Sequence, residues 1–157
     1  ACDYAYEKYG YYTVFLPMQS SRDTAIMQNI KRKMKHESAI IKKRYSVEGM
    51  LSIIKCFDMC IGMRLHTLIY AAINSVPLIG LVYDPKINSF MEYTHQRHYV
   101  DVNKVTDENL KKMLDECVAN YDTIKQDLKE NYGHLKEKAK LNGKYAIELY
   151  EKGSVTL

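Results

Sequence analysis

The sequence predicts an α/β fold built on a doubly wound parallel sheet. Short, continuously apolar runs recur along the chain, as at Phe57–Ile61 and Pro77–Val82, and strands buried on both faces of a sheet have this composition. Between them, Met63–Asn74 carries apolar residues at helical spacing. Strand, helix and strand therefore alternate, which is the pattern of a parallel sheet covered by helices.

The other segments continue this alternation. Gly10 suits the C-cap of a helix that ends at Tyr9, and Thr106 with Asn109 suits a helix start. The expected elements are a helix end at Ala1–Tyr9, a strand at Tyr11–Leu16, a helix at Arg22–Lys35, a strand at Ser38–Ile41, a helix from Ser46, a helix from Pro85, a short strand at Tyr99–Val102 and a helix from Thr106. This order is Rossmann-like.

The C-terminal segment is different in composition. From Asp122 to about Lys152 the chain is highly charged and its apolar residues are sparse. Gly133 and Gly143 lie inside this segment, and glycine is unfavourable in a helix interior. The two glycines therefore weaken the prediction of one straight helix here.

Composition limits the class of function. A length of 157 residues fits one domain, and no apolar run approaches the roughly 20 residues of a membrane span. The net charge of +4 suits anionic substrates or an anionic membrane surface, but it is too small to indicate nucleic-acid binding. The four cysteines form no CxxC pair and no disulfide framework, which favours a reducing cytoplasm.

The start of the helix after Phe57–Ile61 has the features of an anion site. The first turn of a helix has backbone N–H groups without helical partners and a positive partial charge. Gly62 allows close approach of a ligand, and Arg64 adds a permanently charged planar fork. His66 adds a group that gives or takes a proton near neutral pH. An alternative is equally open: Arg64 and His66 pair with nearby carboxylates and only hold a loop in place.

A second cation follows the next strand. Lys86 stands at the start of the helix that Pro85 opens, and neighbouring parallel strands would bring it to the same crevice as Gly62. It would then help to hold a phosphate or carboxylate. The alternative, a surface lysine beside a turn, is equally open.

These motifs carry a family resemblance. The stretch MRLH at Met63–His66, followed by an apolar helix, VPLIGLVYDPK at Val76–Lys86 and then Phe90, resembles the polysaccharide pyruvyl transferase family. Upstream, VFLPMQ followed by Asp23, and SVEGMLSIIKCFDMCIG at Ser46–Gly62, are also similar to it. The resemblance covers roughly residues 1–103.

The resemblance implies an architecture. Members are similar to two-domain GT-B enzymes, so residues 1–157 would be a single C-terminal domain. Residues 104–157 would form helices that pack on this domain and toward its own N-terminal domain. A family strand would precede Ala1, so the first strand of this sheet, in the middle of the usual order, would be missing here.

The resemblance also implies a reaction. The family transfers the enolpyruvyl unit of phosphoenolpyruvate onto two sugar hydroxyls as a cyclic ketal. Arg64, Leu65 and His66 would contact phosphoenolpyruvate, with Gly62 and Lys86 beside them. His66 is the candidate acid or base, Arg64 would stabilise charge, and no metal or cofactor is expected. The acceptor would be a lipid-linked or polymer precursor of a bacterial cell-surface polysaccharide, used in the cytoplasm at the inner face of the membrane. This chain alone would be inactive.

Two other functions fit the same fold. The chain would otherwise be the nucleotide-sugar-binding half of a GT-B glycosyltransferase, in which Glu92 is the local candidate for binding the ribose. It would otherwise be a non-catalytic α/β interaction domain. Retention of Arg64, His66 and Lys86 together argues mildly against that last function.

Overall fold

Helices and strands alternate from Cys2 to Asp101, which confirms the α/β prediction. The computed structural model describes residues 1–152, apart from the side chains of Ser20 and Ser21. The elements are α1 (Cys2–Tyr9), β1 (Thr13–Phe15), α2 (Ser20–Lys33), β2 (Ser38–Ile40), α3 (Val47–Ile54), β3 (Cys60–Gly62), α4 (Leu65–Ile73), β4 (Leu78–Val82), α5 (Pro85–Tyr93), β5 (Tyr99–Asp101), a 3-10 turn η1 (Val102–Lys104), α6 (Asp107–Ala119) and α7 (Tyr121–Glu151).

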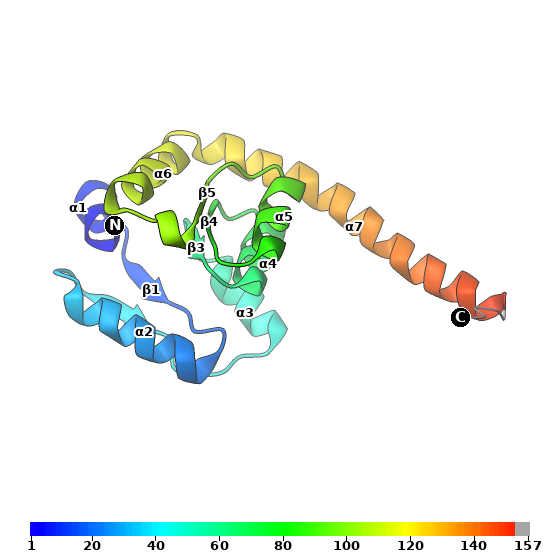
Figure 1. Ribbon diagram of the computed structural model, residues 1–157, viewed down its shortest axis with the longest axis horizontal. Coiled ribbons are helices and arrows are strands. Elements are labelled where there is room, and N and C mark those ends of the chain that lie inside the picture. Colours follow the sequence, from blue (N-terminus) through cyan, green and yellow to red (C-terminus); the bar gives the residue numbers. More distant parts are fainter. Residues whose placement is uncertain (153–157) are drawn as a thin grey trace.

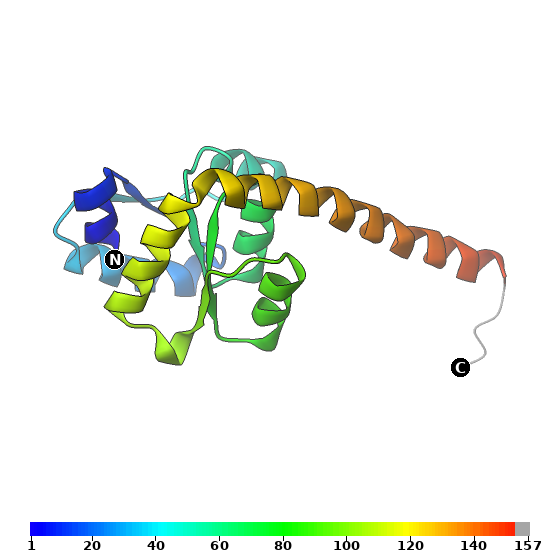
Figure 2. The same cartoon turned by 90° about the horizontal axis from the view of Figure 1, so that it is seen from above.

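Every strand pairing is parallel. β1 pairs with β2, and β3 pairs with β4, which pairs with β5. Figure 2 shows α4 and α5 on one side of the β3–β5 strands and α1 and α6 on the other. Contacts of α4 with α5 and of α1 with α6 agree with this arrangement. The sheet is thus covered on both faces, as in a doubly wound fold.

The sheet is interrupted between β1 and β3. The strands form a two-stranded sheet, β1–β2, and a separate three-stranded sheet, β3–β4–β5. Figure 1 shows β1 and α2 set apart from β3. The doubly wound order places its first strand at this position. That a segment outside residues 1–157 supplies this strand stays a prediction.

The hydrophobic core lies under the three-stranded sheet. Its fully buried side chains come from α3, α4, β4, α5, α6 and α7, and they include Ile54, Leu68, Leu78, Ile79, Ile87, Met91, Cys117 and Leu128. The β1–β2 half contributes little to this core, since each residue of β1 is only half-buried. The site described below therefore stands where a well-packed half of the domain meets a less buried one.

The two glycines of the C-terminal segment do not interrupt its helix. α7 is one helix of 31 residues that includes both Gly133 and Gly143. A Cβ at either glycine would meet nothing within 4 Å, so neither is required by packing. Each glycine destabilises the helix by only about 1 kcal/mol, and the neighbouring lysine, glutamate and leucine residues have a high helix propensity. In the first half of α7, Ile124 and Leu128 are buried. Figure 1 shows the second half of α7 projecting from the domain.

The far end of α7 carries apolar side chains without a covering layer among the described residues. Tyr145, Ile147 and Tyr150 are 55%, 59% and 88% exposed, as expected for a helix that packs on another domain. That such a domain covers them stays a prediction.

A polar cluster fastens α1 to α6. The hydroxyls of Tyr4 and Tyr9 donate to the Asp115 carboxylate at 2.8 and 2.6 Å, and Lys8 Nζ lies 3.0 Å from it. The hydrogen bonds from Tyr9, Lys8 and Tyr4 lower the pKa of Asp115 to about 2. The cluster therefore favours the folded state while Asp115 is ionised.

Replacement of Asp115 by asparagine tests this cluster. The folded carboxyl has a pKa of about 2 and an unfolded aspartate one of about 3.9, so its stabilisation is present above about pH 4 and is lost as the pH falls toward 2. Asp115→Asn should lower the free energy of unfolding in urea, and by less at about pH 3 than at about pH 7. An equal loss at both pH values would contradict this role.

Two glycines should respond to alanine with opposite signs. Gly10 has a φ of 72° as the C-cap of α1, whereas Gly133 is helical, and a Cβ at either one meets nothing within 4 Å. Gly10→Ala should destabilise the protein, and Gly133→Ala should stabilise it, each by about 1 kcal/mol. Thermal and urea unfolding of both variants measure the effect, and shifts of the same sign would refute the backbone argument.

Candidate functional site

The candidate site lies where β3 passes into α4, at the carboxyl edge of the sheet. Arg64 is the N-cap of α4, with extended backbone at φ −93° and ψ 130°. Among the described residues no side chain caps this helix. The backbone oxygen of Arg64 accepts from the N–H groups of Thr67 and Leu68, at 3.0 and 3.3 Å. The first turn of α4 therefore lacks a side-chain cap, and binding of an anion there stays a prediction.

Gly62 has a packing role that the sequence did not indicate. It is buried, and a Cβ built on it would lie 2.7 Å from Leu68 Cδ2. A side chain here would clash with the fully buried Leu68 side chain of α4. Gly62 thus allows the helix to approach the strand, and its contact with a ligand stays a prediction.

Arg64 is held by residues from the other half of the sheet. Its Nη2 donates to Asp23 Oδ1 at 2.7 Å and to Gln19 Oε1 at 3.0 Å. The hydrogen bond and the charge of Asp23, with a further contribution from the Tyr83 hydroxyl, raise the pKa of Arg64. These hydrogen bonds hold the guanidinium, while the Arg64 side chain remains 36% exposed to solvent.

Asp23 is a buried carboxylate at the first turn of α2, and it is only 8% exposed. Besides Arg64, its Oδ2 accepts from the backbone N–H groups of Met18 and Gln19, at 3.1 and 2.8 Å. Burial raises its pKa, but the hydrogen bonds from Arg64 and Gln19 outweigh burial, so the pKa lies below its usual value. Arg64 thus does pair with a carboxylate and hold a loop, as the alternative expected.

His66 and Leu65 differ in their surroundings. His66 is exposed, and its ring lies 6.2 Å from the ring of Tyr70. The ion-paired histidines of residues 1–152 are His36 and His98, so the carboxylate-pairing alternative does not hold for His66 there. Leu65 is partly buried and packs against the core. The imidazole is accessible beside the open end of α4.

Lys86 lies at the start of α5, but this helix has its own anion. Asp84 caps α5 by accepting from the Lys86 N–H at 3.0 Å, and its other oxygen lies 3.3 Å from Lys86 Nζ. The same Nζ stands 5.9 Å from the centre of the Tyr83 ring. Because Tyr83 also influences Arg64, both Arg64 and Lys86 adjoin this tyrosine. The Asp84 carboxylate, however, makes the start of α5 less positive than expected.

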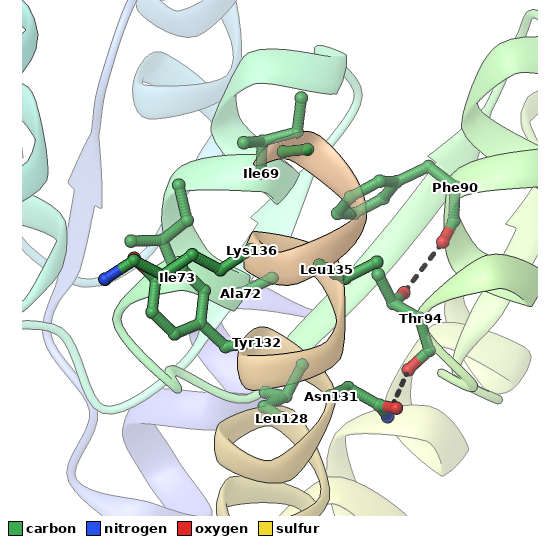
Figure 3. Close-up of a pocket in the computed structure, with 11 residues that line it drawn as sticks. Ile69, Ala72, Ile73, Phe90, Thr94, Leu128, Asn131, Tyr132, Leu135 and Lys136 are labelled. Carbon is green, nitrogen blue, oxygen red and sulfur yellow. Dashed lines mark hydrogen bonds between the residues drawn. The ribbon is translucent and has the colours of Figure 1, made fainter. Parts of the chain in front are cut away.

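Two cavities lie near these elements. An apolar one of about 300 Å³, drawn in Figure 3, opens between α4, α5 and α7 and is lined by Ile69, Phe90, Leu128, Tyr132 and Leu135 among others. It does not include Arg64 or His66. A polar one of about 550 Å³ lies at the carboxyl ends of β4 and β5, and Tyr83, Asp84, Asn88, Asp101 and Asn103 help to line it. Tyr83 thus lines the polar cavity and also influences Arg64.

Sequence reasoning assigned no role in the site to two of these residues, Gln19 and Asp23. Asp23 and Arg64 are 41 positions apart, and neither periodicity nor a local motif relates them. The strand–helix alternation was a usable signal, because it brings the loops after β1 and β3 to the same edge of the sheet. In the described part of the chain, no three His, Cys, Asp or Glu side chains gather as a metal site would need.

The comparisons with known proteins bear on the family of this chain. No curated protein and no solved structure matches the chain. The family model for polysaccharide pyruvyl transferase matches residues 1–85, which is more than half of the 157 residues and includes Asp23, Arg64 and His66. The chain therefore belongs to the polysaccharide pyruvyl transferase family.

Proposed function

We propose that Arg64, Leu65 and His66 bind phosphoenolpyruvate, whose pyruvyl group is transferred as a ketal onto a sugar. One observation carries the proposal: the uncapped start of α4 stands beside a fixed guanidinium and an accessible imidazole. Phosphoenolpyruvate is a small molecule with a phosphate and a carboxylate. Free helix N–H groups and a guanidinium are the donors that such groups prefer.

The reaction can be balanced with the residues present. Protonation of the methylene carbon makes it a methyl group, and positive charge develops on the adjacent carbon. Two sugar hydroxyls then add to that carbon, and inorganic phosphate leaves as its C–O bond breaks. One hydroxyl proton balances the proton given to the methyl group, and the other leaves with the phosphate. His66 is the group that moves a proton, and Arg64 stabilises the departing phosphate.

Other parts of the proposal extend beyond these contacts. Lys86 assists with the phosphate or carboxylate, and no metal or cofactor takes part, because the enol phosphate already carries its leaving group. The acceptor is a precursor of a cell-surface polysaccharide, held mainly by an N-terminal domain of GT-B type. We place the reaction in the cytoplasm at the membrane's inner face. Within residues 1–152, no helix has both the length and the apolar character to cross a membrane.

The nucleotide-sugar alternative has less support. Glu92, its candidate ribose ligand, is near the end of α5 and accepts from Asn88 Nδ2 at 2.8 Å. With a rise of about 1.5 Å per residue, it lies about 10 Å along the helix from the start of α5. That position is far from the carboxyl edge where a ligand would be bound.

Arg64 should be essential for donor affinity. Calorimetric titration of phosphoenolpyruvate into Arg64→Ala should show at least about a tenfold weaker affinity, or 1.4 kcal/mol. Arg64→Lys keeps the charge but loses the fork, so it should bind with intermediate affinity. Because Arg64→Ala leaves Asp23 unpaired, circular dichroism must show that it folds. Binding of UDP-glucose but not of phosphoenolpyruvate would show that the fold was interpreted correctly and the chemistry was not.

His66 should affect turnover more than binding. His66→Gln removes the proton-transfer group from the site, so transfer should slow by about a hundredfold to ten-thousandfold. The affinity for phosphoenolpyruvate should change much less than in Arg64→Ala. Release of inorganic phosphate by the full-length enzyme in the presence of the sugar acceptor measures turnover. A His66→Gln variant with unchanged turnover would remove this residue from the proposed chemistry.

A further inference from the structure

We infer that Asp23 is a positioning residue for the anion site, because it holds the Arg64 guanidinium in one orientation at the start of α4. The inference rests on the proposed function and extends it, since it states how the binding group is prepared before the donor arrives. It also gives a role to a residue on a different element from the RLH motif.

The carboxylate is a rigid anchor. Asp23 is 8% exposed, and its backbone N–H donates to Gln19 O at 3.1 Å in the first turn of α2. Its Oδ2 is occupied by the N–H groups of Met18 and Gln19, at 3.1 and 2.8 Å. These bonds leave Oδ1 pointing at Arg64, which it meets at 2.7 Å. The carboxylate therefore has little freedom to turn elsewhere.

Arg64 is restrained at both ends. Its backbone is fixed as the N-cap of α4, and both hydrogen bonds to Asp23 and Gln19 are made by one terminal nitrogen, Nη2. A guanidinium has five N–H donors distributed over three nitrogens, so Nη2 alone does not exhaust it. Ordering a long, flexible side chain on binding lowers affinity. The Arg64 side chain is already ordered by Asp23 and Gln19 before a ligand binds, so this loss of affinity is avoided.

A competing role for Asp23 would change the affinity for the anion in the opposite direction. If Asp23 merely neutralised Arg64, it would compete with the anion, and its removal would tighten binding. The geometry favours positioning, because two backbone N–H groups already donate to Oδ2 of Asp23 and partly compensate its charge. The sign of the change in affinity therefore decides between the two roles.

The chain offers a matched control. Asp3 Oδ1 also accepts two backbone N–H bonds, from Lys35 at 2.9 Å and His36 at 3.1 Å. Asp3 has no place in the proposed site. Asparagine can accept such bonds through its amide oxygen at either position, so only Asp23→Asn removes a charge that faces a guanidinium. Loss of a loop anchor alone would affect both variants alike.

The experiment compares Asp23→Asn with Asp3→Asn, each in the wild-type and the Arg64→Lys background. Titration with phosphoenolpyruvate should give about a tenfold weaker affinity in Asp23→Asn and no change in Asp3→Asn. In the Arg64→Lys background the effect of Asp23→Asn on affinity should largely vanish, since the effects of residues that act through one another are not additive.

Nitrogen-15 relaxation of the Arg64 Nε–H group should show order in the wild type and mobility in Asp23→Asn. Urea unfolding checks that each variant folds.

The outcomes separate the two claims. Unchanged or tighter binding in Asp23→Asn, or an equal effect in both backgrounds, would overturn the positioning role while leaving the proposed function standing. If the wild type binds inorganic phosphate through Arg64 but not phosphoenolpyruvate, the proposed function fails, and the same comparison with phosphate then decides the role of Asp23. Absence of binding for both anions would overturn both claims.

Discussion

The contact between Asp23 and Arg64 joins two halves of a divided sheet. Arg64 follows β3 and Asp23 follows β1, and these strands belong to separate sheets. Breaking a fully buried pair by removing one partner costs about 3–5 kcal/mol. The Arg64 side chain is 36% exposed, so solvent screening makes the cost here smaller. The same contact fixes the loop after β1 and the guanidinium beside α4, so stability and the binding site depend on one interaction.

The two helix starts at this edge show why only one of them suits an anion. Asp84 caps α5, so a carboxylate already occupies the position that a ligand would take. α4 begins with Arg64 instead, and no side chain within residues 1–152 caps it. A helix start without a cap lowers the stability of the fold unless another group accepts hydrogen bonds from its N–H donors. A bound phosphate or carboxylate would supply that group.

The sequence predicted most elements because strand composition and capping are local properties. β4 and α5 were located within a residue, and the Thr106 capping box was identified from its spacing. β3 begins at Cys60, later than expected, because the N–H groups of Cys56 and Phe57 bond back to Ile53 and Ile54 at the end of α3. Cys56 and Phe57 are apolar, as strand residues are, but their backbone N–H groups complete the end of helix α3. Hydrophobicity alone does not show whether such residues end a helix or begin a strand.

The site was predicted in part. Arg64 and His66 were identified from their place at a helix start, but the packing role of Gly62 depends on how closely α4 approaches β3. The partnership of Arg64 with Asp23 depends on how two sheets meet, which no short sequence window contains.

The central claim is that an anion binds at the start of α4. Its most direct test is a nitrogen-15 correlation spectrum recorded during titration with phosphoenolpyruvate. We expect the largest shifts at the backbone N–H groups of Leu65 and His66 and at the side chain of Arg64. Shifts confined to the polar cavity, at residues such as Asn88 and Asn103, would contradict the account.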